Sequence, residues 1–179
     1  MSITILASVM RDNTNNMFIL NQSKGISQLP VEVLWTANYI HEKKIISDYY
    51  TFSNRAICTD TIIVYTPKQI DYVKDDKSVS FCNYINWEAV EQLPDEYVVY
   101  GGLDLISQAI PFANKIRLFV LDVYGDNHDS SNIYLPSINS YAKWIMRNIA
   151  TVEKPPQYKS LLQQDLTLHN MSLLEFVKI

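Results

Sequence analysis

The chain has 179 residues, of which 47% are hydrophobic and 19% are charged, and its formal net charge is −4. This length and apolar content suit one domain, spanning 1–179, with a substantial core. Acidic residues outnumber basic ones, which argues against a nucleic-acid binder because no basic excess is present to neutralise backbone phosphates.

The cysteine count indicates the redox compartment of the chain, and the first apolar segment indicates whether the chain enters a membrane. Cys58 and Cys82 are too few for a disulfide framework or a cysteine zinc site, which favours reduced thiols in a cytoplasmic setting. The first apolar run is too short for a membrane span and lacks the basic flank of a signal peptide. We therefore expect no contact with a membrane and assign no metal site.

Predicted strands and helices alternate along the first half of the chain. Ile3–Met10 is a continuous apolar run, as expected for a central strand covered on both faces. After the polar, asparagine-rich loop Arg11–Gln28, the segment Leu29–Glu32 opens a helix, since proline suits a first turn and a carboxylate there is favoured by the helix dipole. Lys44–Ser47 and Thr61–Tyr65 are short β-branched strands.

The second half continues this alternation of short apolar segments. In chain order we predict a strand at Ser78–Tyr84, a helix at Asn86–Leu93, a strand at Tyr97–Tyr100, a helix at Leu103–Ala113 and strands at Ile116–Val123 and Ser172–Ile179, with a loop at Asp126–Pro136 and only a weak pattern at Tyr141–Ile149. Strands that alternate with helices predict a mostly parallel sheet between helical layers.

Two adjacent glycines, Gly101 and Gly102, separate the predicted strand Tyr97–Tyr100 from the helix that follows. A strand that turns into a helix there presents backbone N–H groups, and glycine lets a ligand approach the main chain, which suits a phosphate. The same pair also fits a tight turn that requires positive φ. The local sequence leaves both interpretations open.

Four segments, in order along the whole chain, resemble dihydrofolate reductase. They are the strand Ile3–Met10 with Ala7 inside it, LPVEVLW at Leu29–Trp35, VVYGGLDLISQAIPFANKIRLFVLDV at Val98–Val123, and a loop with Gly125-Asp126 and Leu135-Pro136 before the closing LLEFVKI. The resemblance implies an α/β fold with a mostly parallel eight-stranded sheet, an antiparallel C-terminal strand and helices on both faces. It also allows a cis peptide bond between Gly101 and Gly102.

The resemblance also implies an activity, namely hydride transfer from NADPH to dihydrofolate or a related pterin. Glu32 falls at the position of the family's single active-site acid, where a carboxylate orients the amino-pyrimidine edge and helps to protonate the substrate. The substrate would contact Leu6, Glu32 and Tyr100, and the cofactor would contact Ala7, Thr51, Gly101, Gly102, Asp104 and Leu105. Without the resemblance, Glu32 is interpreted as a surface acid at a helix N-terminus.

Several positions depart from the family pattern. Asp48-Tyr49 stand where the family has Gly-Arg, whose arginine meets the cofactor's 2′-phosphate. An acid near a phosphate is unfavourable, so NADH, which lacks the 2′-phosphate, is a candidate cofactor in addition to NADPH. Thr59 stands where an arginine pairs with the substrate's glutamate tail, and Phe119 where a threonine braces the acid.

Three functions therefore remain open. The first is a dihydrofolate reductase-like, NAD(P)H-dependent enzyme that acts on a small pterin or folate with Glu32 as its acid. The second is a non-catalytic binding or structural protein on the same scaffold, for which a protein partner is expected. The third is a reductase for another pterin- or pyrimidine-like substrate, as in the riboflavin-pathway reductases. Retention of Glu32, Gly101 and Gly102 favours the enzyme narrowly, because fold alone does not settle function.

Overall fold

The computed structural model describes residues 2–12, 17–19, 30–54, 57, 59, 61–67, 79–124, 135, 143–152 and 167–179. The strands are β1 (Ser2–Arg11), β2 (Met17–Ile19), β3 (Lys44–Asp48), β4 (Thr61–Tyr65), β5 (Val79–Cys82), β6 (Glu96–Tyr100), β7 (Lys115–Tyr124), β8 (Trp144–Val152) and β9 (Thr167–Lys178). The helices are α1 (Pro30–Ile40), α2 (Tyr49–Asn54), α3 (Trp87–Gln92) and α4 (Leu103–Ala109), the last continued by the 3₁₀ helix η2 (Ile110–Phe112).

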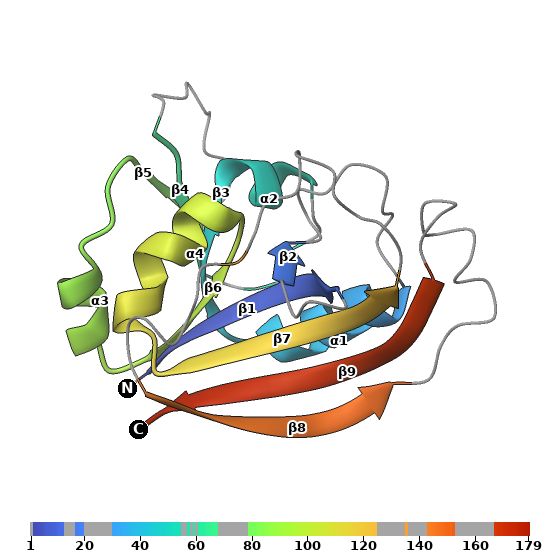
Figure 1. Ribbon diagram of the computed structural model, residues 1–179. Coiled ribbons are helices and arrows are strands. Elements are labelled where there is room, and N and C mark those ends of the chain that lie inside the picture. The colour runs from blue at the N-terminus through green and yellow to red at the C-terminus, as the bar shows by residue number, and fades with distance from the viewer. Residues whose placement is uncertain are drawn as a thin grey trace.

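The described strands form one sheet in the order β5-β4-β3-β6-β1-β7-β9-β8, and β2 pairs with β1 outside this path. Strands β5, β4, β3, β6, β1 and β7 run parallel to one another, whereas β9 is antiparallel to both β7 and β8. Helix α1 lies behind the sheet, and α3 and α4 lie in front of it (Figure 1). This arrangement confirms the predicted α/β architecture, including the antiparallel C-terminal strand.

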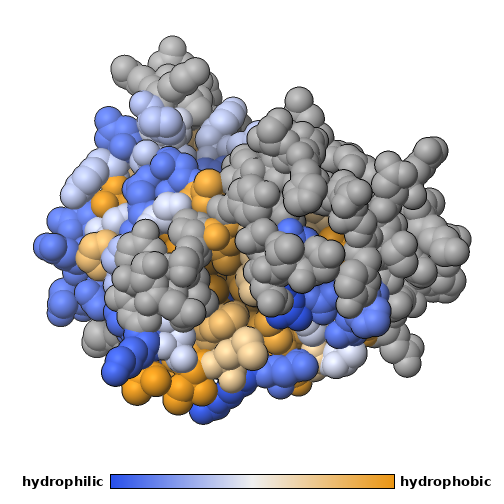
Figure 2. Space-filling view, in the orientation of Figure 1, coloured by the Kyte–Doolittle hydropathy of each residue, from blue (hydrophilic) through white to orange (hydrophobic). Residues whose placement is uncertain are grey.

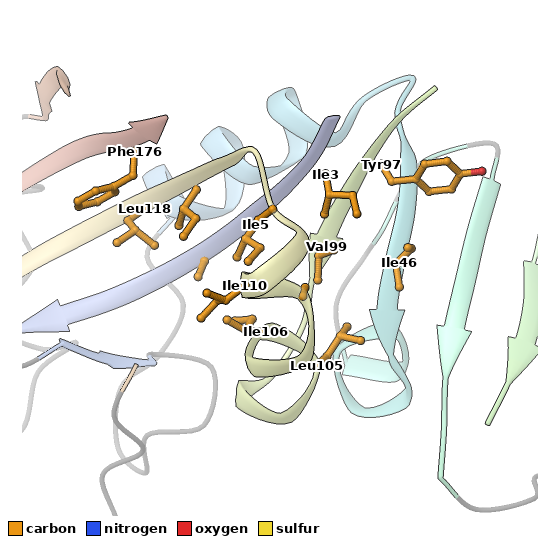
Figure 3. Packing of buried hydrophobic residues seen from close by; sticks show 14 of the residues in the cluster. Ile3, Ile5, Ile46, Tyr97, Val99, Leu105, Ile106, Ile110, Leu118 and Phe176 are labelled. Atoms are coloured by element: carbon orange, nitrogen blue, oxygen red, sulfur yellow. The ribbon is translucent and has the colours of Figure 1, made fainter. Parts of the chain in front are cut away.

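The central position of β1 explains its unbroken apolar sequence. It pairs with β6 on one side and β7 on the other, and both of its faces are covered. Ile3, Ile5, Ala7 and Val9 belong to the cluster that includes the buried residues of α4. Figure 3 shows side chains of α4 directed at the strands of this cluster. On the opposite face, Leu6 packs with Ile40 of α1 and with apolar residues of β3 and β6.

Figure 2 shows how hydrophilic and apolar residues are distributed over this face of the molecule. In the space-filling view, hydrophilic residues cover most of the left flank, where these helices lie in Figure 1, and apolar residues show at the centre and along the lower edge (Figure 2). Among the described residues, no helix combines the length and the apolar character that a membrane crossing requires.

Most predicted elements are confirmed, with differences that have local causes. The predicted loop Arg11–Gln28 contains the short strand β2, which pairs with the end of β1. The helix predicted over Leu103–Ala113 ends as an α-helix at Ala109, because Pro111 lacks the N–H that would continue it. The weak pattern at Tyr141–Ile149 corresponds to β8, and the predicted loop Asp126–Pro136 lies outside the described residues except for Leu135.

Candidate functional site

The candidate site is defined by the carboxyl ends of three neighbouring strands. Strands β3, β6 and β1 are parallel and adjacent in the sheet, so their carboxyl ends meet at one edge. In open α/β sheets, ligands bind at this edge. It carries the second half of β1 with Ser8, the end of β3 with Asp48, and the turn at Gly101 after β6.

Glu32 lies in the first turn of α1, and its side chain is buried, with 3% of the residue exposed. The hydroxyl of Ser8 on β1 donates a hydrogen bond of 2.5 Å to Oε1 of Glu32. Burial of a carboxylate is costly unless donors satisfy it, so this contact holds the acid in a defined position beneath the helix. The interpretation of Glu32 as a surface acid is therefore wrong.

Phe119 stands at the position where the resemblance predicts a threonine. Phe119 on β7 is the register partner of Ser8 on β1, and it is fully buried. Its ring centroid lies 5.7 Å from that of Trp35, so the two rings form an aromatic contact between β7 and α1, the helix that carries Glu32. Ser8, on the adjacent strand, supplies the hydroxyl that contacts the acid. Sequence reasoning missed Ser8, since a serine inside an apolar strand carries no local signal.

The side chain of Asp48 lies against the Gly101–Gly102 turn, which the resemblance assigns to the cofactor. Asp48 is the last residue of β3, and α2 begins at the next residue. Its Oδ1 accepts a hydrogen bond of 2.7 Å from the backbone N–H of Thr51. Its Oδ2 accepts one of 3.1 Å from the Thr51 hydroxyl and another from the backbone N–H of Gly102. Both carboxylate oxygens are therefore engaged by the groups that surround this turn.

The same carboxylate explains why residue 101 is a glycine. A Cβ placed on Gly101 would collide with Oδ2 of Asp48 and would lie 2.8 Å from Cδ2 of Leu105. Neither glycine has a φ in the left-handed region, with Gly102 at φ −79° and ψ 179°. The described residues contain no cis peptide bond, so the Gly101–Gly102 bond is trans. The positive-φ and cis expectations are both wrong, and close approach of Asp48 is what requires glycine here.

Other residues assigned to the site lie in the core or at the surface. Leu6 and Tyr100 are buried beneath α1, where the Tyr100 carbonyl accepts a hydrogen bond of 2.7 Å from Ser47. Ala7 and Leu105 are buried in the cluster on the α4 face. These four side chains shape the sheet and its covering helices. Asp104 is exposed in the first turn of α4.

The donors at this turn decide whether a dinucleotide fits. Phosphates are bound by backbone N–H and hydroxyl groups aimed at the ligand. Here the N–H and hydroxyl of Thr51 and the N–H of Gly102 are all aimed at Asp48. A phosphate beside this carboxylate would also be repelled. The residues of the turn do not fit the pyrophosphate that NADPH and NADH share.

The position that the resemblance assigns to the substrate's glutamate tail is taken by Thr59, whose side chain is uncharged. The hydroxyl of Thr59 donates a hydrogen bond to the backbone carbonyl of Lys43 at the start of β3. Arg55, the nearest basic residue along the chain, lies outside the described residues. Within those residues, no group of three or more His, Cys, Asp or Glu side chains is close enough to hold a metal ion.

The amino ends of the strands hold a separate polar network. Lys43 forms an ion pair of 2.6 Å with Glu96, which also accepts a hydrogen bond of 3.0 Å from Thr4. Burial raises the pKa of Glu96, but the Lys43 and Thr4 hydrogen bonds and the Lys43 charge outweigh it, so the net pKa is lowered. Burial, and then the charge of Glu96, raise the pKa of Tyr39. This network lies at the edge opposite Glu32 and Asp48.

Comparison with known proteins shows the fold. No protein-family model and no curated protein matches the chain in sequence. Among solved structures, dihydrofolate reductase from Enterococcus faecalis complexed with NADP(H) and RAB-propyl is similar, with a TM-score of 0.65 and 13% sequence identity. The likeness covers 99% of this chain and 96% of that one. The chain therefore has a dihydrofolate reductase-like fold.

Proposed function

We propose that the chain binds a small pterin-like ligand on its dihydrofolate reductase-like scaffold, with Glu32 as the anchoring acid. The observation that carries this proposal is the buried carboxylate of Glu32, positioned by the Ser8 hydroxyl near the ligand-binding edge of the sheet. A buried carboxylate is favoured where a ligand brings its own donors to it. The similar solved structure, which is a dihydrofolate reductase, points to the same ligand class.

The recognition chemistry follows from the carboxylate. An ionised carboxylate is planar and accepts two parallel N–H hydrogen bonds, which matches the amino-pyrimidine edge of a pterin. The hydroxyl of Ser8 contacts Oε1 of Glu32 and limits its rotation, so the acid is oriented before the ligand arrives. Because Thr59 replaces the arginine expected for the glutamate tail, the proposed ligand is a pterin without that tail rather than folate.

The ligand is bound and not reduced in this proposal. Reduction needs a nicotinamide cofactor, and Asp48 takes the Thr51 and Gly102 donors that the cofactor's phosphates would use. The second candidate is the NAD(P)H-dependent reductase, in which Glu32 helps to protonate a dihydropterin. It is supported by the fold and by the presence of Thr51, Gly101 and Gly102 at the positions that the resemblance assigns to the cofactor.

Ligand titration of the whole chain tests the proposal. Quenching of tryptophan fluorescence is measured with dihydropterin and with dihydrofolate, for the unmodified chain and for Glu32→Gln, which keeps the shape and removes the charge. We expect dihydropterin to bind the unmodified chain and Glu32→Gln to lose at least tenfold in affinity. The matched control, Glu96→Gln, changes a carboxylate at the opposite edge and should bind normally. Equal affinities in Glu32→Gln and the unmodified chain would contradict the proposal.

A further inference from the structure

Asp48, the last residue of β3, accepts hydrogen bonds from Thr51 and from Gly102 in the turn that the resemblance assigns to the cofactor. We infer that its carboxylate excludes dinucleotide phosphates from the turn at Gly101–Gly102, so that the chain takes up neither NADPH nor NADH there. The inference concerns this turn alone, and it stands whether or not a pterin binds at Glu32.

The backbone of the sheet fixes where the Asp48 side chain lies. Strand β3 pairs in parallel with β6 through Ile46 and Val99, and its last residue, Asp48, pairs with Tyr65 of β4. Asp48 lies two residues after the buried Ile46 and therefore on the same face of the sheet. This placement puts the Asp48 carboxylate beside the turn that leads from β6 into α4, where it accepts a hydrogen bond from the backbone N–H of Gly102.

The carboxylate occupies three donors beside the turn. Its two oxygens receive the N–H and hydroxyl of Thr51, itself 2% exposed, and the N–H of Gly102. A phosphate would have to displace the carboxylate from all three donors or share them with it. Two anions that share one set of donors repel each other strongly at a partly buried site.

The space beside the backbone of Gly101 is occupied by side chains of the chain itself, in addition to the donors that Asp48 engages. A ligand that approaches Gly101 needs the volume in which a Cβ would stand, and that volume already contacts Asp48 and the side chain of Leu105. Leu105 is 1% exposed and belongs to the main hydrophobic cluster, so it cannot move aside without disturbing the core. Glycine at position 101 thus accommodates a residue of the chain itself.

The exclusion extends to both nicotinamide cofactors. The resemblance places Asp48 near the cofactor's 2′-phosphate, the group that distinguishes NADPH from NADH. The contact with Gly102 and Thr51 concerns the pyrophosphate, which the two cofactors share. The structure therefore predicts that replacing NADPH with NADH does not restore binding.

Binding of NADPH and NADH to the full chain and to two Asp48 variants tests the inference. Nicotinamide fluorescence reports binding, and the backbone ¹⁵N–¹H resonances of Gly102 and Thr51 report whether the ligand reaches the turn. We expect neither cofactor to shift these resonances at millimolar concentration in the unmodified chain. Asp48→Ala frees the donors and should raise the affinity for NADPH at least tenfold, and Asp48→Asn, which preserves the shape, should raise it by a smaller factor.

A matched control separates the role of Asp48 from the general effect of losing a helix cap. Asn86 caps α3 with a hydrogen bond of 3.1 Å from the N–H of Ala89, so Asn86→Ala removes a cap far from the turn and should leave cofactor binding unchanged. NADPH or NADH binding to the unmodified chain, with shifts at Gly102 and Thr51, would overturn the inference. So would variants that fold but bind no better than the unmodified chain. If Asp48→Ala does not fold, Asp48→Asn decides the outcome.

Discussion

Replacing Gly101 with alanine tests whether the Asp48 side chain fills the space beside this residue. The added Cβ would collide with Oδ2 of Asp48 and approach Cδ2 of Leu105 to 2.8 Å, closer than the 3.0 Å that real Cβ atoms respect. Both neighbours are held, Asp48 by its three hydrogen bonds and Leu105 by the core. Overpacking of this kind costs about 1–3 kcal/mol. Disturbing the hydrogen bond between Gly102 and the carboxylate adds about 1–3 kcal/mol.

A double-mutant cycle isolates the Asp48 part of this cost. Urea denaturation, followed by tryptophan fluorescence and circular dichroism, gives the free energy of unfolding of Gly101→Ala, Asp48→Ala and the double variant. Because Asp48→Ala removes the carboxylate that the new Cβ would strike, the two changes should couple favourably by about 1–2 kcal/mol. Additivity within about 0.5 kcal/mol would refute the reasoning, since it would mean that Asp48 does not occupy this space.

Three further predictions concern the rest of the site and its support. Ser8→Ala removes a donor from the buried carboxylate of Glu32 and should lower the free energy of unfolding by about 1–3 kcal/mol, measured in urea. Phe119→Ala truncates a fully buried ring and should cost about 3–5 kcal/mol in the same assay. The pKa of Glu96 is lowered because the hydrogen bond and charge of Lys43 outweigh its burial. The ion pair therefore stabilises the fold at pH values above the unfolded-state pKa of about 4.3. This stabilisation is lost as the pH falls through the lower pKa of the folded state. Glu96→Gln should flatten the loss of stability between about pH 5 and pH 3, and an unchanged slope would contradict this.

The strands of the sheet interior were predictable because strands buried on both faces consist of runs of apolar residues. β1, β4 and β7 all lie inside the sheet, and their sequences are apolar at nearly every buried position. β8 gave only a weak pattern because it is an edge strand whose side chains from Ile145 to Ile149 are exposed. Its strand conformation depends on pairing with β9, a contact between distant segments that local periodicity does not record.

The short elements and the polar contacts of the site were less predictable. Helix α2 has six residues and depends on Asp48, which accepts from the N–H of Thr51 in its first turn. The position of Glu32 was identified through a family resemblance, whereas its hydrogen bond from Ser8 depends on a contact across 24 residues. The contact of Asp48 with Gly102 spans 54 residues. The resemblance indicated that this acid would repel a phosphate, but only the folded chain shows that it accepts hydrogen bonds from Thr51 and Gly102.

The rate of NADPH oxidation in the presence of dihydropterin or dihydrofolate tests the central claim most directly. We propose that the buried carboxylate of Glu32 anchors a pterin, while Asp48 closes the turn that the resemblance assigns to a cofactor's phosphates. At high concentrations of the unmodified chain and of both substrates, the account predicts pterin binding with no oxidation above the rate without protein. Pterin-dependent oxidation of NADPH that disappears in Glu32→Gln would contradict it and would establish the reductase instead.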